Sequence, residues 1–137
     1  MSGSRSNYLE AKVLDSLLGG VSYAPLATHY IALFTTMPSD TSPGTEPIVG
    51  GYARCPVTNN LTNWPAATEG DPTTKSNGTL IEFTPCTSDW GVIVAVGIMD
   101  QLAGGNMLYW SDLTVSKSVV TGDIVRILSG GILISAD

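Results

Sequence analysis

The most regular apolar pattern in the chain lies at residues 92–99, within a longer stretch that runs from Asp89 to Asp112. Every residue of 92–99 is apolar or glycine, so an extended chain would present two apolar faces there. A strand with one wet face alternates apolar and polar residues, and this strand is therefore expected to be covered on both sides. Gly104 and Gly105 mark a turn, after which residues 106–112 are predicted to return as the second strand of a hairpin.

The other predicted strands are shorter and are separated by residues that favour turns. They span residues 29–36, 52–57, 79–83, 115–120, 124–128 and 132–135. The short glycine-containing connections indicate hairpins between neighbouring strands. The predicted fold class is mainly β: an antiparallel β-sandwich of about eight short strands with one N-terminal α-helix. We expect a single domain over residues 1–137, with residues 1–28 as its N-terminal helical segment and 29–137 as the sandwich.

The helix is predicted over residues 7–18, where Leu9, Val13 and Leu17 recur every four residues and form one apolar stripe. Asn7 is expected to cap its N-terminus as part of a capping box with Glu10, and the two following glycines end it. A helix of three turns is marginal in water by itself, so the stripe must dock on something. We favour the domain's own sheet, with a neighbouring subunit as the alternative.

Two long segments rich in turn-forming residues interrupt the strands, at residues 39–51 and 59–76. Irregular segments of this length in a small domain are usually functional, so both are candidate contact elements, together with the N-terminal segment. The second contains Trp64 and Pro65. The tryptophan is expected either to contact another subunit, where this residue type is enriched, or to plug the end of the core.

The chain contains unusually few charged residues. Charged residues make up 13% of the chain, about half of the roughly 25% that is typical of soluble domains. Burial of surface against other subunits is one explanation, and a neutral Ser/Thr-rich β domain is the other. The net charge of −6 and the scattered basic residues argue against nucleic-acid binding. No apolar run is long enough to cross a membrane, and the polar N-terminus lacks the layout of a signal peptide.

No set of residues predicts catalysis, a cofactor or a metal ion. His29 is the single histidine and opens an apolar strand, so a structural histidine with satisfied hydrogen bonds is expected. Cys55 and Cys86 fit no metal-binding spacing and are expected to be small buried thiols without a disulfide. The carboxylates beside turns and strand ends are expected to cap backbone donors there: Glu82, Asp89, Asp100, Asp112 and Asp123.

The order of short motifs along residues 29–135 resembles that of a family of small virion proteins of tailed bacteriophages. Members of this family are labelled tail-fibre-like or minor tail proteins, and similar small proteins serve as capsid cement. The resemblance rests on the whole ordered set, which reads Ile31-Ala32-Leu33-Phe34-Thr35-Thr36, Gly44-Thr45-Glu46, Gly50-Gly51-Tyr52-Ala53-Arg54, Trp90-Gly91, Gly97-Ile98-Met99-Asp100, Gly104-Gly105-Asn106-Met107-Leu108-Tyr109 and Gly122-Asp123. It implies a non-enzymatic structural component of the virion, assembled in the cytoplasm of the host bacterium.

The functional hypothesis that we favour from the sequence is a capsid cement or decoration protein. It would stabilise the head by bridging subunits of the major capsid protein, and the resemblance implies a homo-oligomer such as a trimer. The first alternative is a small tail-tip, tail-fibre or adaptor protein. The second is a carbohydrate-binding β-sandwich that stacks sugars on Trp64, Trp90 or Trp110. The proposed subunit contacts are Leu9, Val13, Leu17, Trp64 and Pro65.

Overall fold

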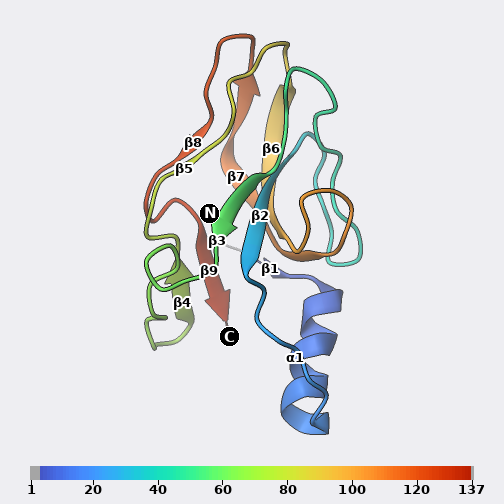
Figure 1. Cartoon of the computed structure of the whole chain (residues 1–137), viewed down its shortest axis with the longest axis vertical. Helices are drawn as coiled ribbons and strands as arrows, with labels where there is room; N and C mark the ends of the chain where they lie inside the picture. Colours follow the sequence, from blue (N-terminus) through green and yellow to red (C-terminus); the bar gives the residue numbers. More distant parts are fainter. Residues whose placement is uncertain (1–3, 137) are drawn as a thin grey trace.

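The two longest strands form a hairpin at the centre of the chain, in a computed structural model that describes residues 4–136 (Figure 1). Residues 1–3, which belong to the segment expected to make contacts, lie outside the described residues. In chain order the elements are β1 (Ser4–Arg5), α1 (Asn7–Gly19), β2 (Thr28–Phe34), β3 (Cys55–Thr58), β4 (Thr73–Ser76), β5 (Ile81–Glu82), β6 (Gly91–Met99), β7 (Met107–Val119), β8 (Arg126–Ile127) and β9 (Leu133–Ala136).

The strands form one five-stranded sheet, in the order β1-β7-β6-β2-β3, and two two-stranded ribbons, β4-β9 and β5-β8. All the pairings are antiparallel. The predicted fold class, mainly β and antiparallel with one N-terminal helix, is confirmed. The second layer consists of the two ribbons, which pack through Ile81, Val125 and Ile132 on the same core as the main sheet. This arrangement is consistent with a sandwich.

From Ile93 to Met99 both faces of β6 are largely buried, as the apolar run predicted, whereas Val92 at its start is exposed. On the ribbon side, Ile93, Val96 and Ile98 join the larger core cluster. On the other side, Ala95 and Met99 join a smaller cluster with Phe34 of β2. The central strand is therefore the part of the fold on which two separate cores are built.

The cover of the smaller cluster is a loop, and no residue of the helix belongs to this cluster. The chain after β2 folds back over Phe34, and the backbone of Gly44 lies so close to that ring that an added Cβ would sit 3.0 Å from Phe34 Cγ. Thr35 N–H donates to Thr45 O at 2.7 Å and fixes this return. Figure 1 shows this loop and the β6–β7 turn on the side of the sheet away from the ribbons. A segment predicted as a contact element thus serves the protein's own core.

β7 corrects the prediction of two separate strands at residues 106–112 and 115–120. Met107 to Val119 form one strand, because no glycine or proline lies between the two predicted pieces. The pairing with β6 instead absorbs a bulge: Ile93 pairs with Lys117 and Ala95 with Asp112, so four residues of β7 face one of β6. A bulge of this kind adds residues to one strand without ending it.

The hairpins predicted among the last strands are also wrong. The segment 124–128 does not pair with 132–135, because β8 pairs with β5 and β9 pairs with β4. The β9 partner lies inside the segment 59–76 that was predicted to be irregular. Turn signals in the sequence locate chain reversals, but they do not specify which strands pair across them.

The helix spans one residue more than predicted, and its cap differs. Ser6 is the N-cap: its hydroxyl accepts from Leu9 N–H at 3.2 Å and donates to the carbonyl of Met107. Asn7 is the first helical residue, so the capping box with Glu10 is wrong. Gly20 ends the helix in the left-handed conformation at φ 66°, which confirms the predicted glycine stop.

Candidate docking surface

A pocket of about 340 Å³ opens between the β4-β9 ribbon and the segment that joins α1 to β2. Leu9 at the base of the helix, Tyr23 in the connecting segment and Tyr109 of β7 form one part of its wall. Trp64 and Lys75 form another part on the ribbon side. Because the sheet and the ribbon diverge here, the pocket exposes side chains that would otherwise close the core, and its lining is mostly apolar.

The aromatic rings of His29 and Trp64 contact each other in the pocket wall. The rings of His29 and Trp64 meet edge to face, with centroids 6.1 Å apart and planes at 77°. His29 Nδ1 and Trp64 Nε1 are buried and have no hydrogen-bond partner among the described residues. Burial lowers the pKa of His29 because it disfavours the charged imidazolium. A structural role for His29 stays a prediction, and the expectation that its hydrogen bonds are satisfied is wrong for Nδ1.

The position of Trp64 decides between the two options given for it. Its side chain is 5% exposed and belongs to the larger core cluster, so it plugs the end of the core. A turn places it there: Trp64 N–H donates to Asn60 O at 2.9 Å, and Asn63 N–H donates to Asn60 Oδ1 at the same distance. Pro65 is exposed and packs over Gly78, where an added Cβ would meet Pro65 Cγ at 2.6 Å.

The helix carries the second candidate surface. Leu14, Leu17 and Leu18 are 58%, 74% and 85% exposed, and we call these three residues the leucine stripe. Figure 1 shows α1 extending away from the strands, so the stripe has no cover within the described part of the chain. An uncovered apolar patch on a projecting element is a candidate interaction surface.

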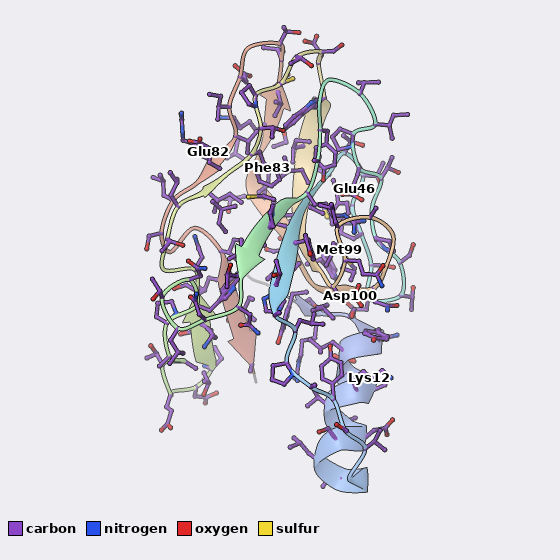
Figure 2. All side chains as sticks on the ribbon, viewed as in Figure 1. Lys12, Glu46, Glu82, Phe83, Met99 and Asp100 are labelled. Carbon is purple, nitrogen blue, oxygen red and sulfur yellow. The ribbon has the colours of Figure 1, made fainter. Side chains whose placement is uncertain are left out.

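Elsewhere on the helix, Lys12, labelled in Figure 2, lies over the ring of Tyr8 with Nζ 5.5 Å from the ring centroid.

The structure brings only some of the predicted contact residues together. Leu9 and Trp64 both line the pocket, although they are 55 residues apart in the chain. Val13 is half-buried, whereas Leu17 and Pro65 are exposed, and none of the three lines the pocket. The prediction missed the pocket residues Tyr23, Lys75 and Tyr109. Tyr23 and Lys75 lie in segments predicted to be irregular, and the apolar pattern of the predicted strand 106–112 does not show that Tyr109 lines a pocket.

Three of the five carboxylates predicted to cap backbone donors do so, whereas Glu82 forms an ion pair instead. Asp100 accepts from Asn106 N–H at 2.7 Å, Asp123 from Val120 N–H at 3.0 Å, and Asp89 from Thr121 N–H at 2.9 Å. Glu82, on the ribbon side in Figure 2, pairs with Arg126 at 2.6 Å. Within residues 4–136, no three histidine, cysteine, aspartate or glutamate side chains gather as they would around a metal ion. None of the described helices is long and apolar enough to span a membrane.

The tryptophans offer no open platform for a sugar. Trp64 and Trp90 are buried, and Trp90 Nε1 donates to Gly50 O at 3.0 Å. Trp110 is half-buried and its Nε1 donates to Asp40 Oδ1 at 2.9 Å. Sugar stacking needs an exposed ring face, so this arrangement removes the basis for the carbohydrate-binding alternative.

This β-rich domain carries both an uncovered apolar helix face and an open apolar pocket, which are features of a structural assembly subunit. The comparison with protein families gives the same class. Residues 4–135 match the model of the family described as Podophage GP4 fiber I protein gp80, and the chain belongs to that family. No curated protein matches the chain. The resemblance to small virion proteins of tailed phages is thereby confirmed, and the protein is a structural component of a phage virion.

Proposed function

We propose that this protein is a small subunit of the phage tail fibre, or an adaptor that joins the fibre to the tail, and that it has no enzymatic activity. The observation that carries the proposal is the leucine stripe on a member of a fibre protein family. A subunit of this kind works through the surfaces that it buries against its neighbours. It is assembled into the virion in the cytoplasm of the host.

The free energy gained by burying the leucine stripe indicates how tightly such a subunit would bind. Covering the exposed parts of the three leucines would contribute roughly 3–6 kcal/mol, at about 1.5–3 kcal/mol for each fully buried side chain. Association between proteins costs an estimated 4–15 kcal/mol in lost freedom of motion. The stripe alone therefore gives weak binding, and stable assembly requires a complementary surface or several copies that bind together.

The capsid cement hypothesis from the sequence stays a prediction. The family description names a fibre, which favours the tail. Both functions would use an apolar interface, so the difference between them lies in the position and the copy number of the protein.

Purified virions separate the two functions. We expect quantitative mass spectrometry to find few copies per particle, relative to the major capsid protein, and cryo-electron microscopy to locate them on the tail. Labelling with an antibody against a tagged chain provides a second measure of position. A copy number comparable to that of the capsid subunits, with density on the head, would overturn the fibre proposal in favour of cement. Absence from purified particles would overturn both.

A further inference from the structure

We propose that the pocket of one copy of this chain receives the leucine stripe of a second copy. This inference rests on the proposed function only in treating the stripe as an assembly surface. The position of the protein in the virion is tested separately, so either proposal can fail without the other.

The two surfaces match in chemistry and size. The pocket is mostly apolar and holds about 340 Å³, which lies in the range of about 300–1,000 Å³ found for binding pockets. The stripe presents three leucine side chains within five residues at the free end of a helix. A helix that places apolar side chains at such spacing in an apolar depression is a common mode of protein recognition. Neither surface has a partner among the described residues.

Charge on the two surfaces points to a second copy as the occupant. Asp15 is exposed and flanks the stripe, about 60° around the helix from Leu18 at 3.6 residues per turn. Lys75 lines the pocket. The ion pairs of the described residues are Glu46 with Arg54 and Glu82 with Arg126, so neither Asp15 nor Lys75 has an oppositely charged partner among those residues. A stripe seated in the pocket of a neighbour would bring an unpaired acid to an unpaired base.

The geometry of the helix also gives the type of contact. Leu9, which lines the pocket, and Leu14 are five residues apart, which places them about 140° apart around an α-helix of 3.6 residues per turn. The stripe and the pocket therefore face different directions on one copy. A contact between two different surfaces is head-to-tail, and it closes into a ring when the rotation between neighbours allows it. The inference thus gives a physical basis for the homo-oligomer predicted from the sequence.

Light scattering coupled to size-exclusion chromatography tests this on the full chain. We expect the wild type to be oligomeric and both Leu17→Asp, in the stripe, and Ala67→Trp, in the pocket wall, to be monomeric. Leu128→Asp is the matched control, because Leu128 is also exposed but belongs to neither surface, and it should leave the oligomer intact. Circular dichroism confirms that each variant is folded.

A mixture of the two variants is the decisive sample. Leu17→Asp keeps its pocket and Ala67→Trp keeps its stripe, so an equimolar mixture should form a dimer that neither variant forms alone. In a second test, Asp15→Lys and Lys75→Asp should each weaken association, and the chain that carries both substitutions should recover it. A monomeric wild type, an oligomer that survives Ala67→Trp, or a mixture that stays monomeric would each overturn the proposal.

Discussion

Glu46 and Arg54 form a two-fold hydrogen-bonded ion pair on the loop-covered side of the sheet. Arg54 Nη2 lies 2.8 Å from Glu46 Oε2, and Arg54 Nε lies 3.0 Å from Glu46 Oε1. The remaining nitrogen, Nη1, donates to the carbonyls of Gln101 and Gly104 at 2.7 and 2.8 Å. Tyr52 completes the network by donating its hydroxyl hydrogen to Glu46 at 2.6 Å. The pair therefore fastens the loop after β2 to the β6–β7 turn, and Figure 2 shows Glu46 and Asp100 on this side.

Arg54→Ala should lower the free energy of unfolding by about 3–5 kcal/mol, because it leaves Glu46 partly buried without its counter-ion. Urea unfolding followed by fluorescence measures the change. The matched control is Arg126→Ala, which removes an ion pair whose side chains are half exposed and should cost about 0–1 kcal/mol. Equal losses for the two variants would show that the Arg54 network does not hold the loop.

Acid should destabilise the protein partly through Glu46. Burial would raise the pKa of this carboxyl, but hydrogen bonds from Arg54 and Tyr52 outweigh it and hold the pKa below its ordinary value of 4.5. A lowered pKa in the folded state stabilises the fold above 4.5, and this contribution is lost as the pH falls through the folded value. The difference in unfolding free energy between the wild type and Glu46→Gln should therefore shrink as the pH is lowered below 4.5. A difference that stays constant across this range would contradict the assignment.

Trp64→Ala should cost about 3–5 kcal/mol of stability, because it removes a buried ring and leaves a cavity at the end of the core. The exposed Leu61 in the same loop provides a control, since Leu61→Ala should change stability by less than about 0.5 kcal/mol. Thermal unfolding followed by circular dichroism compares the two. If Trp64→Ala were as mild as Leu61→Ala, Trp64 would act as a contact residue and not as a plug.

Gly97→Ala should destabilise the fold by about 1–3 kcal/mol through overpacking. An added Cβ would lie 2.6 Å from Phe34 Cε2, a ring that is fully buried under the loop. Gly19→Ala at the end of the helix is a suitable control, because its Cβ would meet only Val21 at 3.9 Å. Denaturant midpoints of the two variants test this. A neutral Gly97→Ala would mean that the loop side of the sheet is loosely packed.

The sequence predicted those parts of the fold that depend on the local pattern of apolar residues. The continuous apolar run identified β6 as a strand with two buried faces, and the four-residue spacing located the helix. The N-cap was misassigned because Ser6 and Asn7 are adjacent and both suit the position. Contacts with Met107 and Leu108, a hundred residues away, select Ser6.

The cover of the second face was not predictable from the pattern. Glu46 and Arg54 lie in irregular segments, and nothing in their spacing shows that they pair with each other and with a distant turn. The candidate site, like the fold, was predicted only in part from the sequence. The apolar spacing of the helix predicted Leu17 as a contact, but Leu14 and Leu18, the other residues of the leucine stripe, were not among the predicted contacts. The pocket depends on how far the ribbon lies from the sheet, a tertiary property that local sequence does not encode.

The bulge in β7 has a consequence for how copies of this protein meet. Beyond Trp110, which pairs with Ser4 at the start of β1, no other strand of the described residues pairs with the outer edge of β7. A straight, unprotected edge would recruit the same edge of any neighbour through backbone hydrogen bonds, and crowded subunits would then aggregate without order. The extra residues opposite Val94 interrupt the regular spacing of those groups. Uncontrolled growth by strand addition is thereby suppressed, so specificity in assembly is left to side chains.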